Sequence, residues 1–545
     1  MQIELPIVWG VIILYFIIVI AIGIFSRRSI VTAEDYHIAG GKVKAFLNGT
    51  AQVAGYLSPA SLLGFPAYVF LLGLPIHWGL VGIAGVMPLT IPLVAGQLRK
   101  AKPVSTTDYF AWRYETNVYG RIILTIAYIW AGMLYIILCM VGMGLAFVAT
   151  LRVHYVTALF VAMIVMIIYL WLGGMVAHTY ATAFQTFVMV FAALAVLLGM
   201  WAVAGGPGPL YATAEKIHYG TFLSPSYNTN YGKVLLRGNF DPDWLFTTGY
   251  ISAFCWASVW ALGALCQPFS VFRVFTAAGP KAARWTFVWA TIWTAVFYTI
   301  LILIGAGARA FIEVFMGHPY LTEGISIKPD NPTLGILIYY YKTFGLGSLV
   351  DYTTLCVTEA FKNPWLLGFL VAGVFAIGMG TVASWALLTA TVLARDWPHY
   401  ILKKPLPPKK EVMWTRIIMT ILIVIGTLIA IKPAAMILDL SGAAFLVILT
   451  LLAPPIITGI WWKRGGPTAF KIYTTVMLVL TIFSWMFSYL VWKAPHAFFL
   501  FPKLGTPNQI YWLYIGFVIW IILCLVTKPS SPETIKKYCE DLHKP

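Results

Sequence analysis

Residues 46–71 read FLNGTAQVAGYLSPASLLGFPAYVFL. This run is long and apolar enough to cross a bilayer as a helix, which takes about 20 residues. Pro59 lies near its middle, and proline lacks a backbone N–H and clashes with the carbonyl four residues earlier, here that of Gly55. We therefore expect a transmembrane helix that breaks inside the membrane and leaves peptide groups free to bind a ligand.

A second run, residues 245–275, carries a similar interruption. It reads GALCQP over residues 263–268, and Pro268 frees the carbonyl of Ala264. The two interrupted helices are the second and seventh that we predict, so they lie five helices apart. A single proline kink often only bends a membrane helix. Two breaks at matching positions of two halves favour a binding site in an inverted-repeat transporter.

The composition is that of a membrane protein. The chain has 545 residues, of which 60% are hydrophobic and 10% charged, whereas soluble proteins have about 45–50% apolar and about 25% charged residues. This balance excludes a disordered chain, a coiled coil and an ordinary cytosolic enzyme. An all-α polytopic fold follows, because lipid cannot satisfy an open sheet edge. The six cysteines show no spacing typical of a disulfide framework or a zinc site.

We predict about 13 transmembrane helices, with the N-terminus outside and the C-terminus in the cytoplasm. They lie at about residues 6–26, 46–71, 76–96, 122–150, 156–173, 177–204, 245–275, 285–308, 366–393, 414–431, 434–461, 469–492 and 510–526. This arrangement puts most of the 36 lysine and arginine residues in cytoplasmic loops. The net charge of +17 therefore indicates membrane orientation and not nucleic-acid binding. The two longer outside loops, 205–244 and 309–365, should carry short surface helices.

Ionisable residues are scarce near the middle of the predicted helices. His77, His154 and His178 lie near helix ends, where we expect them to anchor the interface. No HExxH or GxSxG motif and no catalytic dyad is present, so we expect no enzyme. A polar site must then be built from backbone groups, hydroxyls and amides. In the ninth helix Thr381 could give a hydroxyl to Na⁺, although its small neighbours equally indicate close helix packing.

Four short motifs follow one another along the chain. Residues 33–41 read AEDYHIAGG, residues 173–177 read GGMVA with Gln185 beyond them, residues 263–273 fit GxxxQPxxxxR, and residues 441–464 contain GAAF and WWKR. In this order, and over about residues 5–530, the chain resembles the sodium/solute symporter family. The resemblance implies cation-coupled uptake of a solute, usually with Na⁺.

The resemblance also implies a LeuT-like core of two inverted five-helix repeats. The first helix and loop would be residues 1–45, the first repeat 46–204, an extracellular loop 205–244, the second repeat 245–461 including the loop 309–365, and the last two helices with the tail 462–545. No cofactor other than Na⁺, no nucleic acid and no obligate protein partner is implied. The partners would be a small-molecule substrate and the lipid bilayer of the cell membrane.

Carried over by position, the family's sodium site would use the carbonyls of Ala54, Leu57 and Ile377 and the hydroxyl of Thr381. Three features depart from the family pattern. The Asp often found in the broken first core helix is absent, since residues 55 and 56 are Gly and Tyr. A second hydroxyl residue is replaced by Gly380, and a position that is often Asp or Gln is Thr182. Water or Ser384 could complete the site. Coupling to H⁺, or uniport, therefore stays an alternative to Na⁺ coupling.

Substrate contacts are predicted at the two breaks, from Tyr56, Ser58, Cys266 and Gln267. Residues 48–64 resemble the acetate and monocarboxylate branch of the family, and residues 263–268 resemble the proline branch. No basic residue lies at the centre, and exposed N–H groups and helix N-termini are natural donors to a carboxylate. We expect a monocarboxylate such as acetate or pyruvate. The alternatives are proline or another amino acid, and a transporter-like sensor without net transport.

Overall fold

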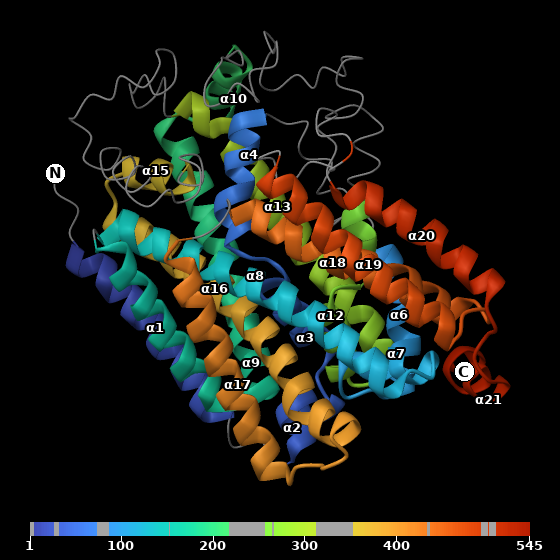
Figure 1. Ribbon diagram of the computed structural model, residues 1–545. Coiled ribbons are helices and arrows are strands. Elements are labelled where there is room, and N and C mark those ends of the chain that lie inside the picture. The colour runs from blue at the N-terminus through green and yellow to red at the C-terminus, as the bar shows by residue number, and fades with distance from the viewer. Residues whose placement is uncertain are drawn as a thin grey trace.

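The computed structural model describes residues 5–26, 32–72, 87–151, 153–216, 257–263, 266–311, 353–432, 437–491, 500 and 508–544. Within these ranges the fold is an all-α bundle of long apolar helices, as predicted (Figure 1). The described residues contain no β-strand, and the β-type pairing among them is an isolated parallel bridge between Val43 and Ala277. Side chains from almost every helix contribute to one continuous hydrophobic core.

The predicted spans all overlap described helices. The long ones are α1 (Leu5–Ser26), α6 (Met87–Ala101), α8 (Asn117–Leu151), α9 (Tyr155–Val203), α13 (Pro280–Ala310), α16 (Pro364–Thr391), α17 (Pro408–Ala430), α18 (Ile437–Trp461), α19 (Pro467–Leu490) and α20 (Asn508–Val526). The third predicted span, 76–96, begins among residues that lie outside the described ranges and continues as α6. Apolar runs of the length needed to cross a bilayer thus located the helices well.

The fifth and sixth predicted spans form one element, α9, which bends sharply between them. Gly173 and Gly174 have non-helical backbone angles, and Gly174 has a φ of 52°. A Cβ atom at Gly174 would also lie 2.6 Å from the ring of Tyr36. Both the positive φ and this close approach require glycine, so the GG pair of the GGMVA motif makes the turn between the two spans.

The second predicted span is broken, as expected. It consists of α3 (Ala45–Tyr56), the π-helical turn η3 (Ala60–Gly64) and α4 (Phe65–Leu72), and Leu57 between them has an extended backbone. The seventh span is also broken. Residues Ala257–Gly263 are followed by α12 (Pro268–Thr276) at an angle of 44°. Ala264, whose carbonyl we expected to be freed, lies outside the described residues.

The unwound residues lie before each proline in the sequence. The prolines therefore do not interrupt a continuous helix through a clash with a carbonyl, as we expected, but stand where a new helix begins. Pro59 is the N-cap of η3, and Pro268 occupies the first turn of α12 after the non-helical Gln267. The fixed φ of proline suits a helix start, where its missing N–H costs nothing. Each proline therefore begins the second half of its span, and the unwound residues are Leu57 and Ser58 in one case and Gln267 in the other.

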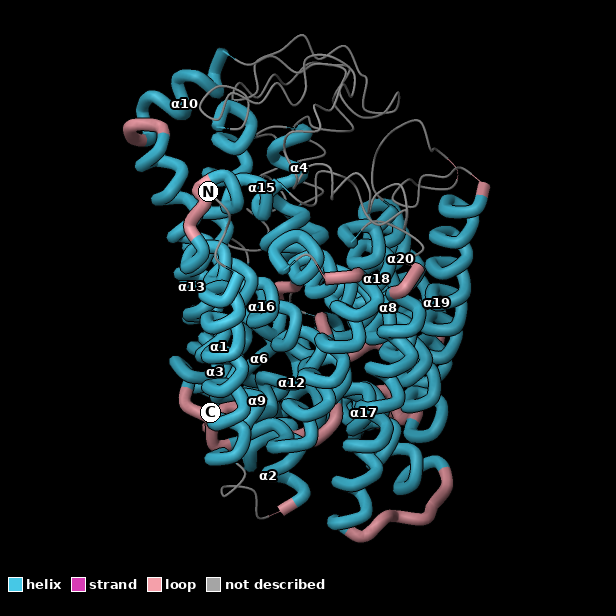
Figure 2. The backbone as a smooth tube through the Cα atoms, turned by 90° about the vertical axis from the view of Figure 1, so that its left-hand side faces the viewer, coloured by secondary structure: helices cyan, strands magenta, loops and turns pink. Residues whose placement is uncertain are grey.

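Two short helices lie at the end of the bundle where α1 begins, α10 (Pro207–Lys216) and α15 (Thr353–Ala360) (Figures 1 and 2). They fall in the two long predicted loops. α15 is more than a surface helix, because Thr354 and Thr358 are fully buried. The Thr354 hydroxyl donates to the carbonyl of Leu62 at 3.2 Å, so α15 packs directly on the broken second span.

The opposite end of the bundle carries shorter elements. These are α2 (Ala33–Ile38), η2 (Ala39–Gly41), α7 (Thr106–Arg113), η9 (Val392–Ile401), α21 (Pro532–Ile535), η11 (Lys536–Glu540) and η12 (Asp541–His543). η9 continues α16, and α7 lies beside it and the start of α8. In Figure 1 both α2 and α7 are seen at this lower end.

Candidate functional site

The two broken spans lie side by side, joined by neutral polar contacts. The Asn48 amide donates to the carbonyl of Arg273 at 2.9 Å, and the Gln52 amide donates to the Ser270 hydroxyl at 2.7 Å. All these residues are buried. A buried hydrogen bond of this kind fixes the register of α3 against α12. These contacts therefore hold α3, the first half of the second span, against α12, the second half of the seventh span.

The oxygen atoms predicted to bind Na⁺ come together beside this break. The Thr381 hydroxyl lies 3.5 Å from the carbonyl oxygen of Ala54 and 3.0 Å from that of Ile377, and it also donates to the carbonyl of Leu57. Thr381 and Ala54 are fully buried. Oxygen ligands of this type suit a hard cation. The assignment of these four oxygens to Na⁺ remains a prediction.

The structure gives a reason for the glycine at position 380. A Cβ atom at Gly380 would lie 2.5 Å from the carbonyl oxygen of Ala54. Any larger residue would push α3 away from α16 at the break. Ser384, one turn later, donates to the Gly380 carbonyl at 2.9 Å, and a Cβ at Gly55 would lie 2.7 Å from its hydroxyl. Ser384 therefore also faces the broken segment.

Aromatic rings and unpaired polar atoms gather at the break in the seventh span. The Gln267 amide donates to the Tyr135 hydroxyl at 3.5 Å. The Phe269 ring contacts Tyr56 at 5.9 Å and Trp385 at 5.5 Å between ring centroids. The Tyr56 hydroxyl, the Gln267 carbonyl oxygen and the indole N–H of Trp385 are buried without a hydrogen-bond partner among the described residues. Buried polar atoms are normally paired, so these three atoms are suited to a ligand.

The family model of the sodium:solute symporters matches residues 36–468. This chain belongs to the sodium:solute symporter family. The match includes both broken spans and the oxygen cluster around Thr381. The family is one of solute symporters, which agrees with the multi-pass membrane transporter expected from the sequence.

Solved structures of transporters share the fold. A Na⁺-coupled sialic acid symporter in a substrate-bound outward-open state superposes with a TM-score of 0.69 at 16% identity, over 96% of this chain and 98% of that chain. MhsT in complex with L-phenylalanine gives a TM-score of 0.51 at 12% identity, over 89% of this chain and 98% of that chain. The LeuT-like fold expected from the sequence is therefore confirmed.

Ser58 and Cys266, the other two predicted substrate contacts, lie at the breaks but differ in surroundings. Ser58 is buried, and its carbonyl accepts the N–H of Ser61 at 2.7 Å. The Cys266 thiol donates to the carbonyl of Gly263 at 3.4 Å and lies 3.9 Å from that of Ile448. The thiol thus packs as a small core group, which makes Cys266 the weaker candidate of the two.

The sequence analysis missed two aromatic residues at the break in the seventh span, Trp385 and Tyr135. Trp385 follows Thr381 by one helical turn, and the spacing of four residues puts both on one face of α16. The Trp385 ring stacks on that of Tyr135 at 5.0 Å between centroids. The i, i+4 spacing from Thr381 was a usable signal for Trp385. Tyr135 lies in the middle of a uniformly apolar span and carried no such signal.

His178 is buried and not at an interface, so our interpretation of this residue was wrong. It is 3% exposed. Its Nε2 lies 2.9 Å from the Ser384 hydroxyl and its Nδ1 lies 3.2 Å from the Tyr169 hydroxyl. The reason is the turn at Gly173 and Gly174, which lies under α2 inside the protein and not at the lipid surface. His154 stands at the N-terminal end of α9, and His77 lies outside the described residues.

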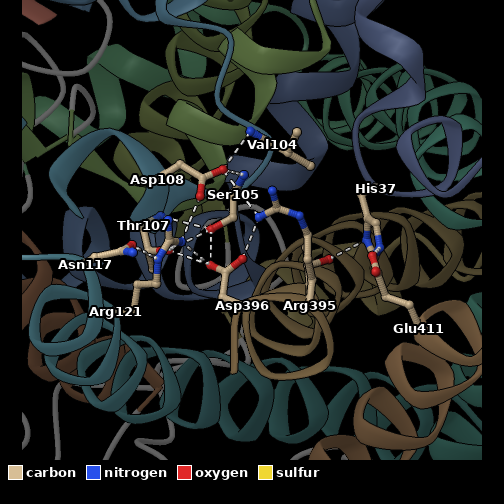
Figure 3. A network of polar contacts seen from close by, with 11 residues as sticks. His37, Val104, Ser105, Thr107, Asp108, Asn117, Arg121, Arg395, Asp396 and Glu411 are labelled. Atoms are coloured by element: carbon tan, nitrogen blue, oxygen red, sulfur yellow. Dashed lines mark hydrogen bonds and ion pairs between the residues drawn. The ribbon is translucent and has the colours of Figure 1, made fainter. Parts of the chain in front are cut away.

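A buried ionic cluster lies at the end of the bundle with α7, away from the breaks (Figure 3). Arg121 of α8 lies 2.8 Å from Asp108 and 3.1 Å from Asp396, and Arg395 lies 2.6 Å from Asp396. The hydroxyls of Ser105 and Thr107 also donate to Asp396. Both carboxylates are fully buried. The cluster therefore ties η9, which continues α16, to α7 and to the start of α8.

The charges in this cluster shift the pKa of Asp108. Burial alone would raise it, but the guanidinium groups of Arg395 and Arg121 and the N–H of Ser105 outweigh burial and lower the pKa below its usual value. Asp108 is thus ionised at neutral pH. Beside the cluster, His37 Nε2 lies 2.7 Å from a carboxylate oxygen of Glu411 (Figure 3). The described residues include no group of three or more His, Cys, Asp or Glu side chains suited to a metal ion.

Proposed function

We propose that this protein is a secondary active transporter that couples the uptake of a small monocarboxylate, such as acetate or pyruvate, to a Na⁺ gradient. The observation that carries Na⁺ coupling is the meeting of the Thr381 hydroxyl with the carbonyls of Ala54, Leu57 and Ile377. These oxygens come from the last turn of α3, from the unwound residue that follows it and from α16, and no charged side chain is needed among them. Such a set fits the coordination that a hard cation prefers.

The carboxylate is supported by the donors at the second break. Tyr56 offers a hydroxyl, Trp385 an indole N–H and Gln267 an amide, and all three side chains are buried. α12 begins at Pro268, directly after the break, so the positive end of its dipole faces the same place. Hydrogen bonds from the Tyr56 hydroxyl and the Trp385 indole N–H to one ionised group would satisfy these two unpaired donors. The Gln267 amide donates to Tyr135 and has a second N–H for the same group. The apolar faces of the Phe269 and Tyr135 rings beside these donors would suit a short alkyl tail on the carboxylate.

We further infer that the N-terminus lies outside and the C-terminus in the cytoplasm. The basic residues of the cytoplasmic loops support this orientation, and the end of the bundle with α2 and α7 is then cytoplasmic. The substrate would enter at the end with α10 and α15 and leave at the other. The partners of such a protein are its solute, Na⁺ and the bilayer.

The test is uptake by the purified full-length protein in proteoliposomes. Labelled acetate, pyruvate and proline are supplied with an inward Na⁺ gradient, with an inward H⁺ gradient, and with neither. Accumulation of acetate or pyruvate that requires Na⁺ is the expected result. Accumulation driven by H⁺ alone would refute Na⁺ coupling, and uptake of proline instead would refute the monocarboxylate.

Two other functions remain to be tested by the same experiment. Proline is kept because GALCQP, residues 263–268, resembles the proline branch, and because a zwitterion also carries a carboxylate for the same donors. A sensor without net transport is kept because Gly380 leaves the cation site with a single hydroxyl. Solute binding without accumulation under any gradient would favour the sensor.

A further inference from the structure

Among the described residues, Arg273 is a buried cation without a carboxylate partner. It lies near the end of α12 and is 2% exposed. Its guanidinium donates to the Thr179 hydroxyl at 2.7 Å and to the Thr182 hydroxyl at 3.0 Å. Within the part of the chain that the structure describes, no Asp or Glu oxygen lies within 4.0 Å of it. Two neutral hydroxyls offset little of the cost of burying a full charge.

The other fully buried arginines in the part of the chain that the structure describes, Arg121 and Arg113, are compensated. Arg121 lies between two buried carboxylates. Arg113 donates to four backbone carbonyls, among them those of Gly459 at 2.8 Å and Trp462 at 3.0 Å, where α18 ends. The negative end of a helix dipole stabilises a cation there. Arg273 has neither kind of compensation in the described residues, so a negative charge is missing beside it.

The surroundings of Arg273 are uncharged on the sides that face the broken span. Gly55 of α3 has no side chain, and a Cβ atom placed there would be 4.0 Å from Nη2 of Arg273. The Thr182 hydroxyl of α9 accepts a hydrogen bond from this same Nη2, and the Thr179 hydroxyl accepts one from Nη1. His178, four residues before Thr182, has both ring nitrogens within hydrogen-bond distance of neutral hydroxyls, those of Tyr169 and Ser384. The groups named around the guanidinium are therefore neutral, and the one charge among them is positive.

We propose that Arg273 is an anion-binding group that receives the carboxylate of the transported solute after the solute leaves the two breaks. Arg273 follows Gln267 by six residues, which at a rise of about 1.5 Å per residue puts it roughly 9 Å further along α12. α12 runs from the break toward the end of the bundle with α2 and α7 (Figure 1). A planar guanidinium binds a carboxylate through two parallel hydrogen bonds.

This inference rests on the proposed function for the identity of the anion, and chloride shares the same chemistry. A monovalent anion of either kind would neutralise the single charge of the site. It would also reduce the repulsion between Arg273 and a Na⁺ ion bound near Ala54, since Gly55, next to Ala54 in the sequence, faces both Ser384 and the guanidinium. Anion and Na⁺ should therefore each increase the affinity of the protein for the other.

The test places a carboxylate beside the guanidinium. Thr182→Asp puts a fixed negative charge next to Arg273, and Thr182→Asn has nearly the same size without the charge. Both lose the hydroxyl, so the difference between them reports the charge alone. Binding of labelled acetate and of chloride to the purified full-length protein is measured in Na⁺ buffer with gluconate as the balancing anion.

The expected result is that Thr182→Asp weakens acetate binding by about 10- to 100-fold more than Thr182→Asn, the range typical of one charge-assisted contact. Weakening of chloride binding alone would support the anion site and assign it to an inorganic anion. Equal affinities of the two variants for both anions would overturn the proposal. If Thr182→Asp does not give a monodisperse protein, the same binding measurements are made on Arg273→Lys and Arg273→Gln. Because Lys keeps the positive charge and Gln does not, Arg273→Gln should bind the anions more weakly than Arg273→Lys, and equal affinities would overturn the proposal.

Failure of this inference and failure of the proposed function give different results. A wild-type protein that accumulates no carboxylate under a Na⁺ gradient refutes the proposed function, whatever the Thr182 variants do. A wild-type protein that does accumulate acetate or pyruvate, with equal anion binding in the two variants, refutes only the role of Arg273.

Discussion

Removing the hydroxyl of Thr381 should weaken the dependence of transport on Na⁺. In the structure this oxygen lies among the carbonyls of Ala54, Leu57 and Ile377, so Thr381→Ala leaves three of the four predicted ligands. An interaction between a charge and a neutral dipole in a buried site contributes about 1.5–3 kcal/mol. This corresponds to an increase of roughly 10- to 150-fold in the Na⁺ concentration for half-maximal uptake.

The assay is the rate of solute uptake into proteoliposomes as a function of Na⁺ concentration. Thr381→Ser keeps the hydroxyl and should stay within about threefold of the wild type. Thr427→Ala is the matched control, because Thr427 is also fully buried and also donates to the carbonyl four residues earlier, at 2.7 Å, but lies in α17. If Thr381→Ala responds to Na⁺ like Thr427→Ala, the oxygen cluster is not the coupling site.

Four further variants or conditions test other parts of the structure. Gln267→Ala should raise the apparent KM for the solute about tenfold by removing a buried donor, whereas the exposed Lys409→Ala should not change it; equal values would argue against the second break as the binding site. Gly380→Ala should lower stability by about 1–3 kcal/mol, seen as a lower apparent Tm, because its Cβ would meet a carbonyl at 2.5 Å. Arg121→Gln should cost about 3–5 kcal/mol by leaving two buried carboxylates short of a partner, and an unchanged Tm would mean that the cluster contributes nothing. Because the pKa of Asp108 is lowered by folding, its ionised form stabilises the protein above the unfolded-state value of about 4; the Tm should hold between about pH 7 and 5 and fall below about pH 4, and Asp108→Asn should remove part of that fall.

The sequence predicted the helical spans and their breaks because both follow from local physical constraints. A bilayer demands apolar runs of fixed length, so α1 or α19 could be located from hydropathy alone. A proline within such a run has few structural options, and Pro59 and Pro268 marked the two breaks to within two residues. What hydropathy could not show was that each proline starts a helix instead of interrupting one.

Lateral burial was not predictable in the same way. Hydropathy reports depth in the membrane, but it does not distinguish a face turned to lipid from a face turned to another helix. His178 was assigned to an interface for this reason, although the turn at Gly173 and Gly174 places it in the core. Among the described residues, the Arg273 guanidinium donates to two hydroxyls of α9, which is far away in the sequence, and so no local pattern could reveal that its partners are neutral.

Gly380 shows how packing and chemistry compete at one position. Read from the sequence, the glycine was a lost oxygen ligand and therefore a reason to doubt Na⁺ coupling. In the structure it lets α16 approach Ala54 closely enough for the Thr381 hydroxyl to reach two carbonyls of the broken span. A residue with a hydroxyl at this position would supply one more oxygen but would separate the helices that carry the others.

The kinds of contact also differ between the parts of the bundle. η9, α7 and the start of α8 are joined by ion pairs among buried charges, such as Arg121 with Asp108 and Asp396. Among the described residues, the side-chain hydrogen bonds that join the broken spans to each other and to α16 come from neutral groups, such as Gln52 with Ser270 and Thr381 with Leu57. The guanidinium of Arg273 makes its hydrogen bonds to α9 instead. Separating a buried ion pair costs several kcal/mol, whereas a neutral hydrogen bond contributes about 1 kcal/mol. In the transport that we propose, the break has to open to each side in turn, so the weaker contacts lie where helices would part.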